Sequence, residues 1–269
     1  MNDQPNDGPR PSIAGVYDAA LGGTENTAPD RALVERARIA MPHIIEGAWA
    51  NRGFLQRAVT RMAGPWGIRQ FIDVGAGMPT QRNTHEVAAE VRPDARVLYV
   101  DNDPQVIARA GQLLVDADHT AVILGDLRDP DTILSHPVTH RLIDFTQPVG
   151  LLVVAVVHFI PDTDNPWGAV ARLMAALPSG SYLALSSVTS DRQEETWEAV
   201  KQQVNPAGYD GHPRTRAQVE HFFTGLDIAP PYEGARAEVA NIGLWGAEDP
   251  DQADDDASHL SYAAVARKP

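Results

Sequence analysis

The sequence of 269 residues has 43% hydrophobic and 22% charged residues, which is typical of a globular chain that buries a sizeable core. Its net charge of −14 argues against a nucleic-acid backbone or an anionic membrane as the main partner, because phosphate contacts need clustered Lys and Arg. The sequence contains no Cys, which excludes disulfides, thiolate nucleophiles and cysteine-type zinc sites.

The first part of the chain is predicted to be a polar tail followed by helices. Residues 1–12 are rich in Pro, Asn and Asp, so we expect a disordered tail. Apolar residues recur at helical spacing within 30–40 and 44–62, and Gly22-Gly23 predicts a turn ahead of them. The N-terminus lacks an apolar signal region, and the longest apolar run, Val149–Val157, is too short to cross a bilayer. We therefore expect a cytoplasmic protein.

From residue 67 onward, short apolar runs alternate with helical patterns. Their lengths and their content of Val, Ile, Leu and Tyr fit the buried strands of a parallel sheet. The predicted strands are Gln70–Val74, Arg96–Val100, Ala121–Leu124, Val149–Val157, Ser181–Val188, Ala235–Trp245 and His259–Ala266. Because the last two follow each other without a helix, they should pair antiparallel. We predict an α/β fold with a doubly wound, mostly parallel seven-stranded sheet that ends in an antiparallel hairpin.

Several helix starts can be predicted from local capping signals. An N-cap acceptor before a proline, or a capping box, satisfies the free N–H groups of a first helical turn. Such signals occur at Asp103-Pro104, Asp129-Pro130, Asn165-Pro166, Asn83 with Glu86, and Thr215 with Gln218.

A glycine-rich segment, DVGAGMPT at 73–80, follows the first predicted strand. Ligands bind in open α/β sheets beyond the carboxyl ends of the strands, and Gly75 and Gly77 allow backbone to approach a ligand closely. A dinucleotide fingerprint would have a third glycine where this sequence has Thr80. A phosphate seat against a helix start is therefore not expected.

Asp73 distinguishes between two classes of ligand. A carboxylate beside a pyrophosphate is repelled, whereas one beside a cation is attracted. S-adenosylmethionine carries an ammonium and a sulfonium and has no phosphate, so the segment favours it over NAD. The structural alternative is that Asp73 only caps the turn.

Two further acids follow the next predicted strands. Asp101 ends the second strand, where a carboxylate can accept both hydroxyl protons of a ribose. Asp103 is better explained as the cap of the next helix. Asp126, followed by Leu127, ends the third strand and could accept from an adenine amino group, with a neighbouring N–H to a ring nitrogen; the alternative is a polar turn between strand and loop.

These motifs resemble the actinobacterial S-adenosylmethionine-dependent methyltransferase family long catalogued as a domain of unknown function. The resemblance covers nearly the whole chain and is weaker toward the C-terminus. The matching segments are VYDAALGGTENTAPDR (16–31), NRGFLQRAV (51–59), GIRQFIDVGAGMPTQRNTHEVA (67–88), VLYVDNDPQVIARA (97–110), GDLRDPDTIL (125–134), VVHFIPD (156–162) and PSGSYLALS (178–186).

The resemblance implies a class I methyltransferase domain over 67–269 and an N-terminal helical cover over 13–66. S-adenosylmethionine is the implied cofactor. Together with the residue-based arguments, we predict that it is bound by Tyr17, Arg52, Asp73, Gly75, Ala76, Gly77, Asp101, Asn102, Asp126, Leu127 and His158. Arg52 would hold the cofactor carboxylate, although buried salt bridges between the N-terminal helices would also explain Arg52 and Arg31.

His158, at the end of the long fourth predicted strand, is the candidate catalytic residue. It could orient or deprotonate a methyl acceptor, hydrogen-bond the cofactor, or cap the loop. His85 could line the pocket, but a surface position is the simpler interpretation. No metal site is predicted, because helix capping explains Asp162 and Asp164 better.

The sequence therefore predicts a methyltransferase that uses S-adenosylmethionine on a small-molecule acceptor, with neither nucleic acid nor membrane as a partner. The alternative is a non-catalytic, regulatory protein that binds S-adenosylmethionine. An NAD-dependent oxidoreductase is disfavoured by Asp73 and Thr80.

Overall fold

The computed structural model describes residues 10–79, 82–114, 119–191, 197, 199–200 and 210–269. The expected disordered tail lies outside these residues apart from 10–12, and so does Thr80 of the glycine segment. Among the helices of the described part, none is long and apolar enough to span a membrane.

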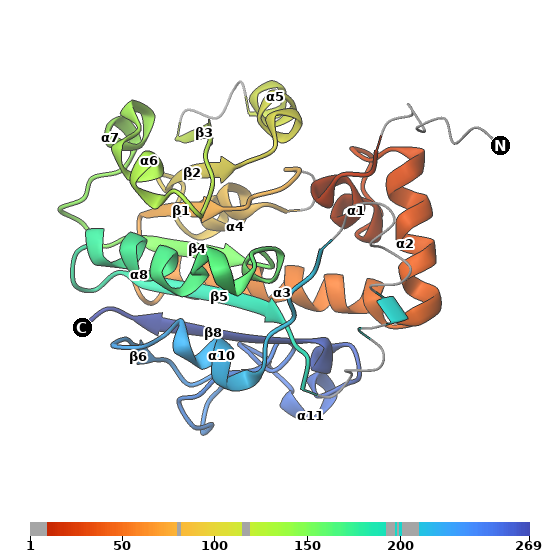
Figure 1. Cartoon of the computed structure of the whole chain (residues 1–269). Coiled ribbons are helices and arrows are strands. Elements are labelled where there is room, and N and C mark those ends of the chain that lie inside the picture. Colours follow the sequence, from red (N-terminus) through yellow and green to blue (C-terminus); the bar gives the residue numbers. More distant parts are fainter. Residues whose placement is uncertain (1–9, 80–81, 115–118, 192–196, 198, 201–209) are drawn as a thin grey trace.

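A mostly parallel sheet forms the centre of the molecule (Figure 1). Its strands are β1 (Gln70–Val74), β2 (Arg96–Asp101), β3 (Thr120–Leu124), β4 (Gly150–Val154), β5 (Tyr182–Val188), β6 (Asp227–Ile228), β7 (Ala240–Asn241) and β8 (Ser261–Arg267). They lie in the order β3-β2-β1-β4-β5-β8-β6, and β7 also pairs with β8. The first five are parallel, whereas β8 is antiparallel to each of its neighbours. The predicted α/β class and the antiparallel end are confirmed.

The sheet differs from the prediction in its last strands, since the described residues form eight strands where seven were expected. Of the predicted strand 235–245 only β7 forms, and the short β6 was not predicted. The apolar residues Val239, Ile242 and Trp245 are all fully buried and are three residues apart. Side chains three residues apart point to opposite faces of a strand, whereas consecutive turns can bring all three into the same core. The expected hairpin is therefore present only as the short β7–β8 pair.

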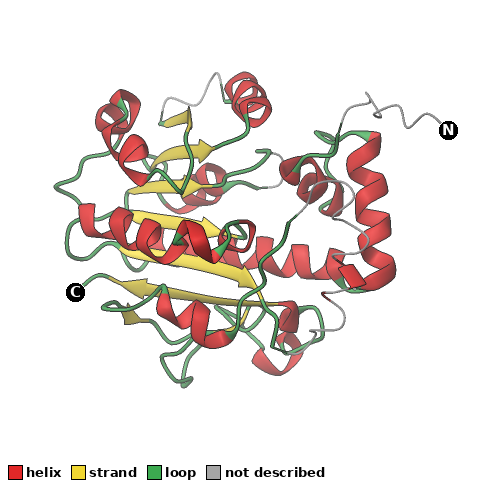
Figure 2. Cartoon of the chain, in the orientation of Figure 1, coloured by secondary structure: helices red, strands yellow, loops and turns green. Residues whose placement is uncertain are grey.

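Helices cover both faces of the sheet, which makes a three-layer molecule (Figure 2). Neighbouring residues of one strand serve opposite faces, as the pleat requires. Phe71 packs with α3 and α4 on one side, whereas Ile72 joins the core beneath α6, α8 and α10 on the other. The helices are α1 (Ile13–Ala20), α2 (Ala28–Ala40), α3 (Ile44–Ala63), α4 (Thr84–Val91), α5 (Pro104–Leu113), α6 (Pro130–Ser135), α7 (Pro137–Leu142), α8 (Pro166–Ala176), α10 (Arg216–His221) and α11 (Pro250–Ala253), with the short 3₁₀ turns η1 (Val157–Phe159), η2 (Asp162–Asp164) and η4 (Ser258–Leu260).

The predicted helix starts are confirmed by hydrogen bonds at the caps. Asp103 accepts from the backbone N–H of Gln105 at 2.8 Å and begins α5. Asn165 begins α8 by accepting from Gly168 N–H at 3.1 Å. Capping boxes begin α4 and α10 as expected. These caps fix where the chain turns after each strand, and therefore where polar side chains reach the edge of the sheet.

The N-terminal helices lie at the carboxyl ends of the parallel strands (Figure 1). The helix α3 belongs to two regions, because its first half contacts α1 and α2 while the stretch from Phe54 to Ala63 is buried against the sheet. A second link joins this region to α5, where Arg109 forms an ion pair with Glu25 of the α1–α2 turn. The region is thus attached to the sheet domain at two separated points.

Candidate functional site

The glycine segment follows β1 at the point where the order of the strands reverses, between β1 and β4. Ligands of open α/β sheets bind at such a reversal. Gly75 and Gly77 have φ angles of +73° and +64°. The backbone N–H groups of Gly75 and Ala76 both donate to the carbonyl of Val100, at 2.7 and 3.2 Å, so the turn is tied to the end of β2.

Gly75 is also required by its surroundings, and we expect Gly75→Ala to lower the melting temperature. An added Cβ would lie 2.2 Å from a methyl carbon of Val156. Overpacking and the positive φ angle together should cost about 2–4 kcal/mol of unfolding free energy. Thermal denaturation measures the effect. Gly77→Ala is the control, since no atom lies within 4 Å of its added Cβ and only the φ penalty applies; an equal loss in both variants would contradict the predicted clash.

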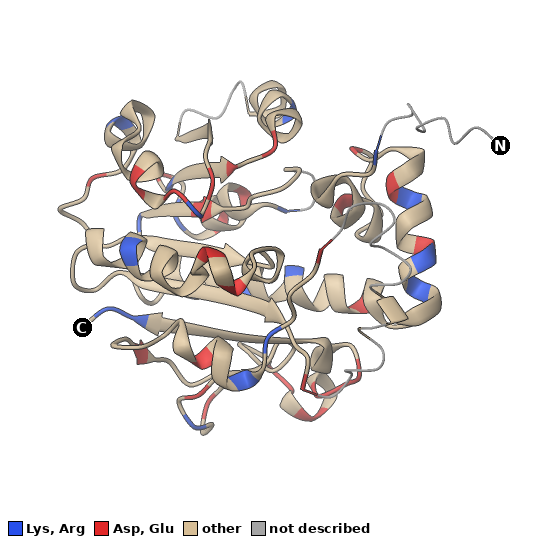
Figure 3. Cartoon of the chain, in the orientation of Figure 1, with Lys and Arg blue, Asp and Glu red and all other residues tan. Residues whose placement is uncertain are grey.

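Asp101 holds the glycine turn from the end of β2. Its carboxylate accepts from the backbone N–H of Gly77 at 2.9 Å and from that of Asp103 at 3.0 Å. Burial raises the pKa of Asp101 above its ordinary value, and these hydrogen bonds oppose the shift. Each oxygen keeps a further lone pair for a ligand. Acidic positions at the end of β2 are visible in red in Figure 3.

A small hollow lies beside this turn. Its wall contains three of the predicted residues, Ala76, Gly77 and Asp101. The other lining residues, which the sequence did not single out, are Pro79, Asn83, Tyr99, Val106, Ala110 and Val122. Tyr99 could not be recognised beforehand, because its position in β2 looked like that of any buried strand residue.

Two buried side chains of opposite charge, Asp73 and Arg52, influence each other electrostatically next to the turn. Asp73 accepts from the hydroxyl of Thr84 at 2.6 Å, and burial raises its pKa to about 6 although Arg52 opposes the shift. The guanidinium of Arg52 lies 5.6 Å from the ring centre of Tyr17, and its Nη1 is 3.5 Å from Oδ1 of Asn83. Within the described residues, Nε of Arg52 has no hydrogen-bond partner.

The alternative explanation of Arg52 and Arg31, buried salt bridges between the N-terminal helices, is not found in the described part of the chain. Arg31 bonds the side chain of Asn26 at 2.7 Å, and Arg52 has no carboxylate within ion-pair distance. The structure instead leaves the charge of Arg52 buried between an aromatic ring and an amide, which the sequence could not show.

A chain of hydrogen bonds connects the N-terminal helices to the strand ends. Asn51 donates to the hydroxyl of Tyr17 at 2.7 Å and accepts from Ser186 at 2.6 Å. Ser186 in turn accepts from the backbone N–H of Ala155 at 2.9 Å. Ala155 has a φ angle of +58°, a region that side chains other than glycine rarely adopt. The network therefore stabilises an unusual backbone turn directly after β4.

This turn changes the position expected for His158. The run 149–157 was predicted as one strand, but β4 ends at Val154 and the chain continues into η1. Val157, the last residue of the run, is buried because the chain turns back into the core. His158 is itself buried, and its Nδ1 accepts from the backbone N–H of Val188 at 3.4 Å. Burial, together with the charge of Arg214, lowers its pKa to about 3.

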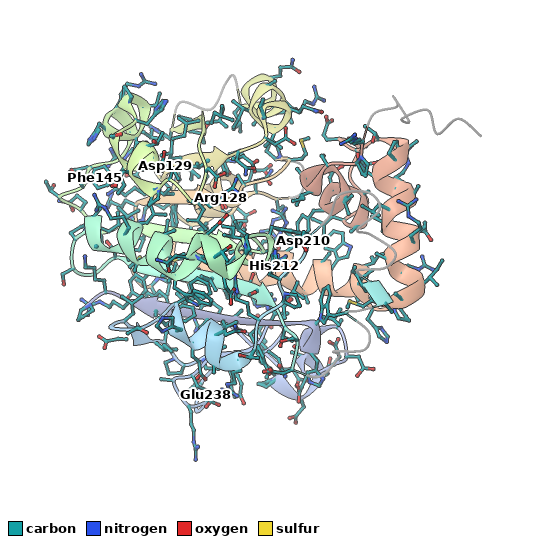
Figure 4. The ribbon with its side chains drawn as sticks, viewed as in Figure 1. Arg128, Asp129, Phe145, Asp210, His212 and Glu238 are labelled. Atoms are coloured by element: carbon teal, nitrogen blue, oxygen red, sulfur yellow. The ribbon has the colours of Figure 1, made fainter. Side chains whose placement is uncertain are left out.

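The two predicted cofactor contacts after β3, Asp126 and Leu127, are both engaged by other parts of the protein. Asp126 forms a bidentate ion pair with Arg128, which lowers the pKa of Asp126, and it also accepts from Asn102 at 3.3 Å. Arg128, labelled in Figure 4, was not predicted and covers this carboxylate. The side chain of Leu127 is buried in the core, so only its backbone can face a ligand. His85 is half-buried, with Nδ1 2.7 Å from the hydroxyl of Tyr99.

Strand order, antiparallel β8 between β5 and β6, and acids at the ends of β1 and β2 together define a class I, Rossmann-like methyltransferase. The chain belongs to the S-adenosyl methyltransferase family, whose profile matches residues 2–269. It is thus an enzyme that uses S-adenosylmethionine as its cofactor.

Solved structures agree with this assignment. A protein of the DUF574 family from Streptomyces avermitilis is 37% identical, with a TM-score of 0.88 over 97% of this chain and 98% of that one. A candidate methyltransferase from Thermobifida fusca is also 37% identical, with a TM-score of 0.88 over 99% of both chains. An O-methyltransferase family 2 protein from Planctomyces limnophilus, at 18% identity and a TM-score of 0.51 over 90% of this chain and 66% of that one, shares the fold. No curated protein matches the chain significantly.

Proposed function

We propose that the protein transfers a methyl group to a small molecule, and that Arg52 and Asp73 hold the amino-acid end of S-adenosylmethionine. The observation that carries this proposal is the pair itself: both side chains are at most 6% exposed, and Nε of Arg52 has no partner in the described residues. A zwitterion offers a carboxylate to the guanidinium and an ammonium to the carboxylate. Burying two such charges is costly unless each is compensated.

The other predicted contacts fit the nucleoside end. Gly75, Ala76 and Gly77 bring backbone to the edge of the hollow, and Asp101 has lone pairs left for ribose hydroxyls. Asn102 and Asp126 lie next along the strand ends and are joined to each other by a hydrogen bond. We assign Asp126 and the backbone of Leu127 to the adenine end of the cofactor. The carboxylate of Asp126 is bonded by Arg128, so Arg128 would have to move away or leave one carboxylate oxygen to the adenine.

S-adenosylmethionine supplies a methyl group already activated on a sulfonium, so the chain needs mainly to align the acceptor and to exclude water. We propose that residues 13–66 are the cover that does the excluding. Tyr17 supports this role, because it lies against Arg52 and is held by Asn51 and by the carbonyl of Ala48 at 3.3 Å. The cytoplasmic location expected from the sequence stays a prediction.

Two proteins of the same fold support a small acceptor. The Planctomyces limnophilus structure is a complex with apigenin. The plantazolicin methyltransferase BamL, at 12% identity and a TM-score of 0.54 over 95% of this chain and 96% of that one, is a complex with a desmethylplantazolicin analogue and S-adenosylhomocysteine. These ligands belong to those proteins, and the acceptor of this chain is to be found by experiment.

Titration calorimetry tests the cofactor assignment. We expect the protein to bind S-adenosylmethionine and not NAD, and Arg52→Met to weaken binding about 10- to 100-fold, because a charge-assisted hydrogen bond is lost. Arg38→Met removes an exposed arginine of α2 and should leave the affinity unchanged. Wild-type protein that fails to bind S-adenosylmethionine, or an Arg52→Met variant that binds it normally, would contradict the assignment.

The acceptor can then be sought with S-adenosylmethionine that carries an isotopically labelled methyl group. Fractionated small molecules are incubated with the enzyme, and labelled products are identified by mass spectrometry. Labelled products that disappear in Arg52→Met support the proposal. Tight cofactor binding with labelling only of proteins or nucleic acids would contradict the small-molecule assignment, and binding without any labelling would favour the regulatory alternative.

A further inference from the structure

Arg214, in the loop before α10, is a charged residue with a buried side chain that is 1% exposed. Its Nη2 donates to the carbonyls of Val157 at 3.1 Å and Ile160 at 2.7 Å, and its Nη1 forms an ion pair with Asp162. The guanidinium also lies 4.7 Å from the ring centre of Trp167. One side chain therefore fixes three points of the loop 157–162, the loop that carries His158.

The backbone around Arg214 ties the same loop to the end of β5. Arg214 N–H donates to the carbonyl of Val188 at 2.9 Å, and His212 N–H donates to the carbonyl of His158 at 2.7 Å. Val188 N–H in turn donates to Nδ1 of His158. His158 is thus held through its backbone and its ring by segments that are far apart in the sequence. In the view of Figure 4, His212 lies at the carboxyl edge of the sheet, between α8 and the N-terminal helices.

The ring contacts determine what the imidazole of His158 can do. Because Nδ1 accepts a backbone N–H, the neutral ring carries its proton on Nε2 and can donate a hydrogen bond there. A pKa of about 3 keeps the ring neutral from pH 5 upward. A ring in this state cannot take a proton at Nε2, and its Nδ1 is already occupied.

We propose that Arg214 is a positioning residue for the acceptor end of the site, which fixes His158 as a hydrogen-bond donor that orients the methyl acceptor without deprotonating it. This inference rests on the proposed function. It also narrows the acceptor class, because the acceptor atom must offer a lone pair without help from His158. Hydroxyl or thiol groups acidic enough to ionise in solution meet this condition, because the anion keeps further lone pairs beside the one that accepts from His158. Amines meet it where another group of the same molecule accepts from His158, because their nitrogen has one lone pair.

NMR of the full-length protein labelled with ¹⁵N-histidine tests the inference without an acceptor. His158→Gln identifies the His158 signals among the nine histidines of the chain. We expect wild-type His158 to be a single Nε2–H tautomer from pH 5 to 8. In Arg214→Met we expect its pKa to rise toward the ordinary value and the tautomer to become mixed. The charged or titratable groups around the ring are Arg214, Asp162, His212 and Asp210, and only the first is changed.

Arg216→Met is the matched control, because that arginine bonds Glu220, Glu238 and the carbonyl of Val239 and does not contact the loop 157–162. It should leave the His158 signals unchanged. If Arg214→Met does not fold, Arg214→Lys keeps the charge but replaces the two nitrogens that bond the carbonyls and Asp162 by one, so the loop should be held less firmly and the tautomer should again become mixed. Unchanged His158 signals in a folded Arg214 variant, or a wild-type ring that is Nδ1–H or protonated at pH 7, would overturn the inference.

Calorimetry on the same samples separates this inference from the proposed function. The folded Arg214 variants should bind S-adenosylmethionine within about threefold of wild type, because the guanidinium acts on the acceptor end. Failure of the wild type to bind the cofactor overturns the proposed function, whatever the tautomer. Normal binding with an unresponsive His158 overturns only the positioning role of Arg214.

Discussion

Replacing Asp73 by Asn is expected to stabilise the ligand-free protein at pH 8 and to weaken its binding of S-adenosylmethionine. The wild-type carboxylate is buried, and its pKa is raised to about 6, so its ionisation at pH 8 opposes folding. Asn removes that charge and can still accept from Thr84. At about 1.4 kcal/mol per pH unit, the gain in unfolding free energy should reach roughly 1–3 kcal/mol. The affinity should fall about 10- to 100-fold, because a cationic ligand loses its partner.

The wild-type protein should show opposite pH dependences for stability and for binding. A raised pKa contributes stability that is complete below the ordinary carboxyl value near 4 and is lost as the pH rises through about 6. Cofactor affinity should rise over the upper part of this window, because Asp73 becomes ionised. The charged and titratable groups that face Asp73 are Arg52, Tyr99 and Asp101. Urea denaturation at pH 4–8 and calorimetry at pH 5–8 measure the two effects.

Asp94→Asn provides the control, since Asp94 is an exposed surface carboxylate paired with Arg69. It should change neither the stability above pH 6 nor the affinity. A loss of stability in Asp73→Asn at pH 8 would contradict the raised pKa of Asp73. If the affinity of the variant for the cofactor kept the wild-type pH dependence, the assignment of Asp73 to the cationic part of the cofactor would be wrong.

Asp101→Ala is expected to reduce the affinity for S-adenosylmethionine about 10- to 100-fold, because the charge-assisted hydrogen bonds to the ribose are lost. The N–H of Gly77 also loses its acceptor, which should lower the unfolding free energy by about 1–3 kcal/mol. Calorimetry and a thermal-shift titration with the cofactor provide the measurement.

Asp103→Ala is the matched control for Asp101→Ala, because it removes another acid, two residues away, whose role is to cap α5. Loss of an N-cap should cost about 1 kcal/mol of stability and leave the affinity close to that of wild type. Equal losses of affinity in the two variants would show that Asp101 acts only through the structure of the turn and does not contact the ribose.

Local signals predicted much of the fold and part of the site. The strand Gln70–Val74 was predicted with its exact bounds, because it is a short apolar run followed directly by a glycine. In the structure its five residues are buried, and Gly75 takes a positive φ angle that ends the strand. The acids at the strand ends follow from the same logic. The predicted strand 149–157 was too long, since an apolar run does not reveal that Ala155 turns the chain. Arg214 could not be found in advance, because its two carbonyl partners lie 54 and 57 residues earlier.

The helix α3 contacts both the N-terminal helices and the sheet, and this constrains how a ligand could enter and leave the site. The stretch from Phe54 to Ala63 is part of the sheet core, and Arg52 lies two residues before it on the same helix, so Arg52 should stay with the sheet when α1 and α2 move. Opening of α1 and α2 would have to break the Tyr17–Asn51 hydrogen bond and the Glu25–Arg109 ion pair. The second contact is partly exposed and therefore screened by salt. Cofactor exchange should consequently become faster as ionic strength rises, while the charge pair that recognises the amino-acid end stays in place.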